Sequence, residues 1–313
     1  MPPEKIAKAK RLVSHAFHAR NLARSEYRSL LGSLRHVATC IRPARVFLQR
    51  LRAGERLLHR TRRIPVSANM RDDLLWWGAI LDSPTLNGIP LEYFDGHPIQ
   101  DITILTDASD EGICAIDPAA SRYLTYKFSP QDLELITAFH DGVANEFDIN
   151  YRELLACAFT VLAWGPRWRQ ERAQAKTIHV HFRIDNTTAV SWQSKMAARN
   201  SRAQLLVRLL GAWELQFGLR FSSSHIPGTE NTTADAGSRR WGSASHAHMF
   251  AELTQGWSQA PTPTSIHTLM TAWCSVSENT PLHPPPSRHT TELSATGSYG
   301  QPDAESPGSS SPR

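Results

Sequence analysis

The sequence predicts an α/β fold in which a mixed five-stranded sheet is flanked by helices and preceded by a small basic helical segment. Three observations lead to this prediction. The first part of the chain repeats apolar residues at helical spacing between many arginines. From about residue 96, short β-type runs alternate with turn residues. Two later strands are separated by helices, which requires crossover connections and therefore parallel pairing in part of the sheet.

The first segment, residues 1–95, is expected to be helical and strongly basic. Residues 1–70 contain sixteen Lys or Arg and three acidic residues, although the whole chain has a net charge of only +5. One helix carries an apolar stripe formed by Leu30, Leu31, Leu34, Val37 and Ile41. Pro43 ends it, a short helix resumes at 46–51, and a third spans 69–81. A basic segment next to an acidic remainder of the chain suits a nucleic-acid partner. The alternative explanation is a basic helix face that is simply exposed to solvent, and charge alone does not decide between the two.

Residues 96–245 hold the predicted sheet. Its strands are expected at 101–107, 112–117, 122–128, 178–184 and 219–226, and its helices at 151–164, 187–194, 201–217 and after Asn231. The first three strands follow one another across turn residues and so form hairpins. The run at 178–184 alternates apolar and polar positions, and the helix at 151–164 has an apolar stripe. Residues 129–150 are expected to be a loop, either a substrate-facing insertion or a decayed segment.

Residues 246–313 are expected to form a disordered tail. From about Pro261 the composition shifts to Pro, Ser, Thr and Gly. Such a segment has too little apolar surface to offset the entropy of ordering the chain.

Composition also excludes several classes of protein. The chain has 313 residues, of which 41% are hydrophobic, but no apolar run approaches the roughly 18–20 residues that cross a bilayer. The basic start lacks the apolar core of a secretory signal. The four cysteines never form a C-x-x-C pair, so neither a disulfide framework nor a cysteine zinc site is expected. We therefore expect an intracellular protein, in the cytoplasm or nucleus, that is not secreted and has no membrane partner.

Four acidic residues fall where such a sheet would bring them together. Asp107 ends the first strand and Asp185 the fourth, while Glu153 begins the first long helix and Asp235 lies in the last one. Clustered carboxylates repel unless cations neutralise them, and their hard oxygen atoms favour Mg²⁺ or Mn²⁺. Two such ions about 3.5–4 Å apart activate water and stabilise the leaving oxygen in phosphodiester cleavage. Taken singly, each residue is explained as well or better by a turn or a helix cap.

Four motifs surround these carboxylates: TDAS, NYREL, RIDN and HIPGTENTTADAGSR. Together they resemble the ribonuclease H domain of retroelement reverse transcriptases, and residues 225–239 fit the family pattern H-x-P-G-x-x-N-x-x-A-D-x-x-S-R. The resemblance implies a ribonuclease H-like fold that cuts the RNA strand of an RNA–DNA hybrid. It also implies two Mg²⁺ or Mn²⁺ ions with the ligands Asp107, Glu153, Asp185 and Asp235. His225 would be the flexible histidine that assists product release.

The resemblance extends upstream. Residues 25–52 are similar to the thumb and connection segment of long-terminal-repeat and, more closely, DIRS-like retroelements. No Y-x-D-D or similar aspartate pair on a hairpin occurs before residue 98, so no polymerase palm is expected. We expect a retroelement remnant or a fragment of a longer polyprotein, with other retroelement-encoded proteins as possible partners.

A hybrid would be held through its backbone, because a ribonuclease H must accept any sequence. The candidate nucleic-acid contacts near the site are Asn186, Lys195, Arg199 and Arg202, and those further upstream are Arg42, Arg45, Arg50 and Arg52. Asn186 or Asn150 is the candidate for sensing the 2′-hydroxyl. Trp192 either packs against a sugar or base or belongs to the core.

Two other functions compete with this one. An integrase or transposase of the same fold would have three acidic residues with glutamate last, whereas here Glu153 comes second and Asp235 last. The order of the carboxylates therefore argues against it. The other alternative is a catalytically inactive, domesticated or decayed domain that binds nucleic acid without cutting it, and this alternative stays open.

Overall fold

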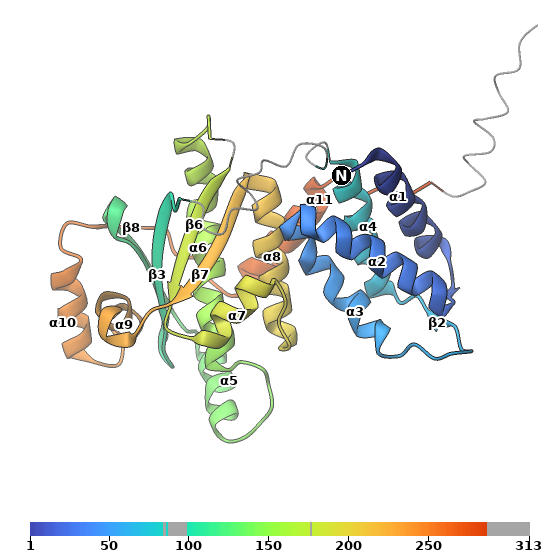
Figure 1. Ribbon diagram of the computed structural model, residues 1–313. Helices are drawn as coiled ribbons and strands as arrows, with labels where there is room; N and C mark the ends of the chain where they lie inside the picture. The colour runs from blue at the N-terminus through green and yellow to red at the C-terminus, as the bar shows by residue number, and fades with distance from the viewer. Residues whose placement is uncertain (84–85, 87–98, 176, 287–313) are drawn as a thin grey trace, which may run out of the picture.

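The computed structural model describes residues 1–83, 86, 99–175 and 177–286. Residues 1–83 form a bundle of helices, which we call the helical unit, and residues 99–286 form an α/β unit around a six-stranded sheet. Figure 1 shows the helical unit on the right, beside the α/β unit. None of the helices in the described ranges is long and apolar enough to cross a membrane.

Helices dominate the helical unit: α1 (Pro3–His18), α2 (Arg24–Cys40), the 3-10 helix η1 (Arg42–Leu48), α3 (Gln49–Glu55) and α4 (Ala68–Asp82). The predicted apolar stripe of α2 is buried, with Leu31, Leu34 and Val37 fully enclosed. The expectation that this segment is helical throughout was wrong. Two-residue strands, β1 (Asn21–Leu22) and β2 (Ile64–Pro65), pair antiparallel. A run of two residues has no periodicity from which a strand can be predicted.

The sheet is mixed, as predicted, and its strand order is β7-β6-β3-β4-β5-β8. The strands are β3 (Ile102–Ala108), β4 (Gly112–Asp117), β5 (Arg122–Lys127), β6 (Ile178–Ile184), β7 (Leu219–His225) and β8 (Ser258–Gln259). β3, β4 and β5 pair antiparallel, whereas β6 is parallel to both β3 and β7. The sheet has six strands rather than the five predicted, because β8 pairs with β5. β8 lies in the segment that we expected to be disordered.

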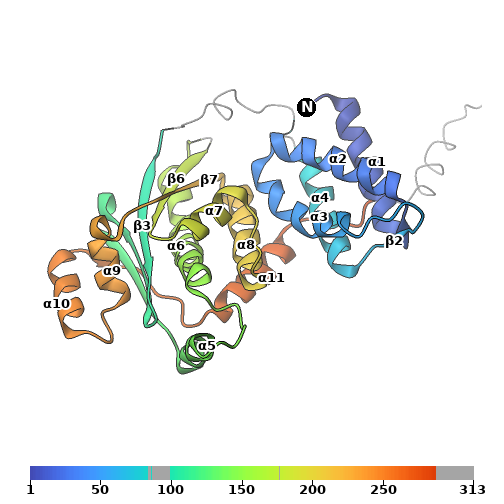
Figure 2. The same cartoon turned by 60° about the horizontal axis from the view of Figure 1, so that its bottom comes forward.

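Helices flank both faces of the sheet (Figures 1 and 2). One face carries α6 (Ile149–Glu171), α7 (Thr187–Lys195) and α8 (Ser201–Phe217), and the other carries α9 (Thr232–Ser238) and α10 (Ala244–Leu253). The segment 129–150, predicted to be a loop, contains the helix α5 (Pro130–His140). Ser129 and Asp132 form a capping box at its start, and Ile136 anchors it to the core.

The prediction of a disordered tail was wrong for residues 246–286. Phe250 of α10 is buried against β4, and α11 (His267–Asn279) buries Leu269. Trp273 of α11 stacks on Trp76 of α4, with 5.5 Å between the ring centroids. A few large side chains therefore order a segment whose average composition is polar. Residues 287–313 of the predicted tail lie outside the described residues.

The helical unit packs against α8 of the α/β unit through two buried ion pairs. Asp73 of α4 lies 2.5 Å from Arg208, and Glu214 lies 2.6 Å from Arg42 of η1. Between them, a Cβ atom on Gly211 would stand 2.7 Å from a methyl group of Val46, so glycine permits the close approach. Arg42 was predicted to contact nucleic acid, and this is corrected here because only 14% of its side chain is exposed.

Candidate active site

The register of the sheet brings two of the predicted carboxylates side by side. β3 and β6 are parallel, and Thr106 pairs with Ile184. Asp107 follows Thr106 and Asp185 follows Ile184, so the two aspartates lie together at the carboxyl ends of neighbouring strands. Asp107 is buried at 4% exposure, while a third of the Asp185 side chain is exposed.

A pocket of about 330 Å³ opens at this edge of the sheet. Asp107, Asp185 and Glu153 line it together. Glu153 comes from the first turns of α6. Asp148 is the N-cap residue of this helix, and its carboxylate accepts a hydrogen bond from the Tyr151 N–H. Three of the four predicted metal ligands therefore face one cavity, although they come from two strands and a helix.

Asp235 and His225 lie beside this pocket rather than in its lining. Asp235 of α9 is paired with Arg239, whose Nε is 2.7 Å from the carboxylate and whose side chain does line the pocket. Asp235 is close enough to Asp107 for its charge to raise the pKa of Asp107. His225, at the end of β7, places Nε2 3.3 Å from Oδ1 of Asp185. Each predicted ligand thus interacts with at least one other.

The site disfavours the ionised form of its most buried carboxyl groups. Burial, together with the charges of Asp235 and Asp185, raises the pKa of Asp107 to about 7, although a hydrogen bond from Ser238 acts in the opposite direction. Burial also raises the pKa of Glu153 well above its usual range, with a further contribution from Asp107. Such a cluster is stabilised by a cation that replaces the protons.

The fit to a metal ion can be judged from the side-chain atoms. Oε2 of Glu153 is buried and has no hydrogen-bond partner, so an acceptor oxygen is left over that a cation would satisfy. In their present rotamers, however, no three His, Cys, Asp or Glu side chains of the described residues are arranged to hold a metal ion. The carboxylate oxygens suit a hard cation, and binding one would require these side chains to change their rotamers.

Residues of the motif at 225–239 support the two aspartates. Asn231 is fully buried and its Nδ2 donates to the carbonyl oxygen of Thr106 at 3.0 Å, next to Asp107. The Ser238 hydroxyl donates to Oδ2 of Asp107 at 2.5 Å. A Cβ atom on Gly228 would stand 2.8 Å from Oδ2 of Asp185, so only glycine leaves this carboxylate undisturbed. The motif therefore holds the end of β3 in place through Asn231 and Ser238 and leaves space for Asp185 at Gly228.

Sequence reasoning missed other residues of the pocket wall. Arg152 is buried and its Nη1 donates to Ser109 O at 2.7 Å and to Asp110 at 2.6 Å. His140, at the end of α5, lies 3.2 Å from Asp110 and also lines the pocket, as does Arg239. Arg152 stands beside Glu153 in the NYREL motif, which is the one signal that pointed to it. His140 comes from a segment predicted to be a loop, so nothing in the sequence linked it to the site.

The four predicted nucleic-acid contacts lie outside this pocket and differ in their surroundings. Asn186 caps α7 by accepting from the Ala189 N–H at 2.9 Å, and Arg202 donates to Asn145 O at 2.9 Å. Both side chains therefore have structural partners. Lys195 and Arg199 are exposed and form no ion pair or side-chain hydrogen bond within the part of the chain that the structure describes.

The remaining candidate contacts, upstream and near the site, also include both side chains with structural partners and exposed side chains. Arg50 is partly buried and lies 3.7 Å from Asp73, whereas Arg45 and Arg52 are exposed. Trp192 is partly buried against the main core, which agrees with the core alternative. Asn150 lies in the first turn of α6, outside the pocket lining.

No protein-family model matches this chain, and a search of curated proteins finds no similar sequence. The function proposed below therefore depends on the residues and the geometry described above.

Proposed function

We propose that this protein is a metal-dependent endonuclease that hydrolyses the RNA strand of RNA–DNA hybrids, as part of a retroelement reverse transcriptase or its remnant. One observation carries the proposal. Asp107, Glu153, Asp185 and Asp235 come from four elements spread along the chain, yet they interact electrostatically at one edge of the sheet. The charges of their neighbours and burial raise the pKa of Asp107 and of Glu153, which is costly to the fold, and a bound cation would offset this cost.

The fold is compatible with a ribonuclease H-like domain. Three antiparallel strands come first, and the later strands β6 and β7 join β3 in parallel across helices. The motif residues Asn231 and Ser238 contact the strand that bears Asp107. These contacts support the resemblance that the sequence motifs carry.

Each residue of the site has a distinct part in the proposed reaction. Asp107, Glu153, Asp185 and Asp235 would hold Mg²⁺ or Mn²⁺, whose chemistry is to activate water and to neutralise charge on the leaving oxygen. Arg239 presents a guanidinium in the pocket wall, where it can pair with a phosphate. His225 is exposed beside Asp185, and we assign it the part of a flexible histidine that assists release of the product.

The reaction can be tested directly. Purified protein is incubated with Mg²⁺ or Mn²⁺ and a labelled RNA–DNA hybrid, and in parallel with double-stranded DNA and double-stranded RNA of the same sequence. We expect cleavage of the RNA strand of the hybrid and of neither other duplex. Failure to cut the hybrid with either ion would contradict the proposal.

An inactive nucleic-acid-binding domain is the second candidate, and one observation favours it. Arg239 already pairs with Asp235 and occupies the pocket wall, so part of the negative charge is neutralised without a metal ion. Binding of the hybrid with no cleavage would support this alternative.

Divalent cations should stabilise the protein more at alkaline than at acid pH. The pKa of Asp107 is about 7 in the folded chain against an ordinary value of 3.8, so the folded state binds more protons between these values. Without metal, stability should therefore fall as the pH rises from about 4 to about 7, as this carboxyl group ionises inside the fold. Mg²⁺ should offset that loss only where the proton has left.

The measurement is the melting temperature with and without Mg²⁺, at about pH 5.5 and about pH 8. We expect the larger increase at the higher pH, and a smaller pH dependence in Asp107→Asn, which lacks the titrating group. An equal increase at both pH values would mean that these carboxylates do not bind the ion.

A further inference from the structure

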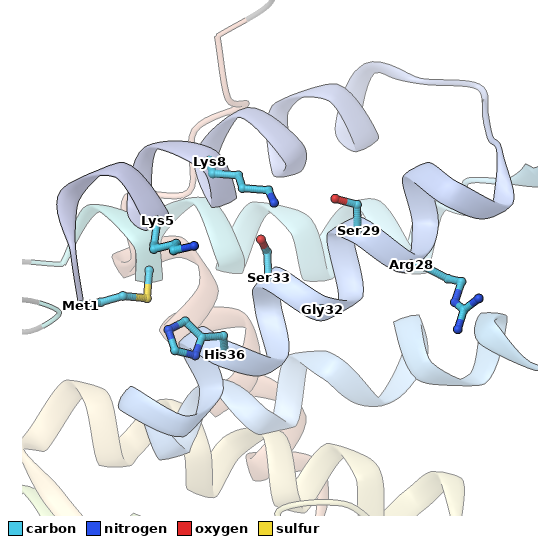
Figure 3. Close-up of a pocket in the computed structure, with 8 residues that line it drawn as sticks. All are labelled: Met1, Lys5, Lys8, Arg28, Ser29, Gly32, Ser33 and His36. Atoms are coloured by element: carbon cyan, nitrogen blue, oxygen red, sulfur yellow. The ribbon is translucent and has the colours of Figure 1, made fainter.

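A second pocket, of about 410 Å³, lies in the helical unit between α1 and α2 (Figure 3). We call it the basic groove. Its lining includes the four basic side chains of Lys5, Lys8, Arg28 and His36. In Figure 3 Lys5 and Lys8 extend from α1, and the other two extend from α2. The groove belongs to a different unit from the carboxylate pocket (Figure 1).

The basic side chains of the groove have no acidic partner. All four are exposed, and none forms an ion pair or a side-chain hydrogen bond with another described residue. Three neighbouring acidic residues are paired elsewhere: Glu26 with His15 and Arg63, Glu55 with Arg35, and Asp82 with Lys10. Glu4 of α1 is exposed and lies one helical turn before Lys8, so its charge offsets part of the positive charge. Among the described residues, the positive charges of Lys5, Lys8 and Arg28 therefore outnumber the single negative charge of Glu4, and this excess attracts an anion.

The shape and the remaining lining define the kind of anion. The hydroxyl groups of Ser29 and Ser33 stand on the α2 wall among the basic side chains (Figure 3). Gly32 lies between them, and a Cβ atom there would meet nothing within 4 Å, so the space above it is open. Among the described residues, His36 is the only aromatic side chain that lines the groove, so these residues offer no platform for stacking a series of bases. Cations and hydroxyls without stacking surfaces suit phosphate groups.

We propose that the basic groove binds the phosphate backbone of a nucleic acid, as a contact separate from the carboxylate pocket. The choice of a nucleic acid over another polyanion rests on the proposed function. The groove holds the hybrid without reading its sequence and raises its affinity without taking part in hydrolysis. Lys5, Lys8 and Arg28 each neutralise a phosphate, and the binding constant falls with salt by a slope of about 0.9 per neutralised phosphate.

Gly32→Glu is the sharpest test, because its matched control is present in the same unit. The new side chain would stand in the groove and lie one helical turn from Arg28 and from His36. Gly78 of α4 is also a helical glycine whose Cβ would meet nothing within 4 Å, and it does not line the groove. Both substitutions add one negative charge and raise helix propensity, so neither should unfold the protein.

The probe is a labelled RNA–DNA hybrid, and binding is measured in EDTA so that no cleavage is needed. At low salt we expect Gly32→Glu to weaken binding by about tenfold or more, while Gly78→Glu stays within about twofold of the unchanged protein. Equal affinity of the two variants overturns the proposal. Binding of anionic lipid vesicles at the groove, with no binding of the hybrid there, also overturns it.

A charge variant measures the same contact through its salt dependence. Lys5→Gln with Lys8→Gln should reduce the slope of log binding constant against log salt by about 2. The control, Arg167→Gln with Arg172→Gln, removes two exposed charges at the C-terminal end of α6, the opposite end of this helix from Glu153, and should leave the slope nearly unchanged. An identical slope in both double variants contradicts the assignment.

The outcomes separate this inference from the proposed function. If the hybrid is not cut but Gly32→Glu still weakens its binding, the nuclease proposal fails and the groove stands. If the hybrid is cut and Gly32→Glu binds it as well as Gly78→Glu does, the groove alone is refuted.

Discussion

Asp185→Asn should lower the rate of hybrid cleavage by at least roughly 100-fold, the range found when a group that stabilises transition-state charge is removed. The substitution replaces a carboxylate by an amide of the same shape, so it removes a metal ligand's charge and little else. Asp185 is also the most accessible of the three predicted metal ligands that line the pocket, so the fold should tolerate the change. Binding of the hybrid should stay intact or become tighter, because a negative charge beside the phosphates is lost.

The experiment compares single-turnover cleavage rates and, separately, dissociation constants in EDTA. Asp141→Asn is the control, since Asp141 is exposed at the end of α5 and lies outside the pocket lining. Cleavage by Asp185→Asn at close to the unchanged rate would show that Asp185 is not a metal ligand.

Asp73→Ala should destabilise the protein by about 3–5 kcal/mol, the usual cost of leaving a buried charge without its partner. Asp73 is fully buried, and its carboxylate lies 2.5 Å from the guanidinium of Arg208, which is 5% exposed. Arg208 also lies over the rings of Phe47 and Trp273, so it cannot easily swing into solvent. The pair joins the helical unit to α8, and both units should unfold more readily without it.

Chemical denaturation at about pH 8 measures this effect, because burial raises the pKa of Asp73 to about 6 and the carboxyl group is ionised above that value. The double variant Asp73→Leu with Arg208→Met removes both charges and should be much closer to the unchanged protein. A loss of less than about 1 kcal/mol in Asp73→Ala would mean that the pair contributes little to the junction.

The strands and helices that could be predicted are those with a strong local pattern. The run at 178–184 alternates apolar and polar residues and forms β6 with the predicted bounds. The structure departs from prediction where order depends on a few distant contacts. α11 is ordered by side chains such as Leu269 and Trp273, which pack on elements far away in the sequence. A composition average cannot reveal such contacts.

The candidate site shows the same division. Asp107 and Asp185 could be placed together from the sequence, because they follow strands that later prove to be parallel neighbours. Arg42 was assigned to nucleic acid because it lies in a basic segment, yet its partner Glu214 is 172 positions away. His140 reaches the pocket only because α5 forms where no helix was predicted. The charge of a segment can be counted from the sequence, but the tertiary fold decides which basic side chains form ion pairs within the protein.

The central claim is that the four carboxylates form one binding site for divalent cations. Crystals of the protein soaked in Mn²⁺ test it through anomalous difference density. The account predicts one or two peaks in the pocket, about 2 Å from oxygen atoms of Asp107 and Asp185, and about 3.5–4 Å apart if two ions bind. Glu153 and Asp235 should turn towards them. A pocket that stays free of Mn²⁺ at concentrations supporting nuclease activity, or density elsewhere on the protein alone, would contradict it.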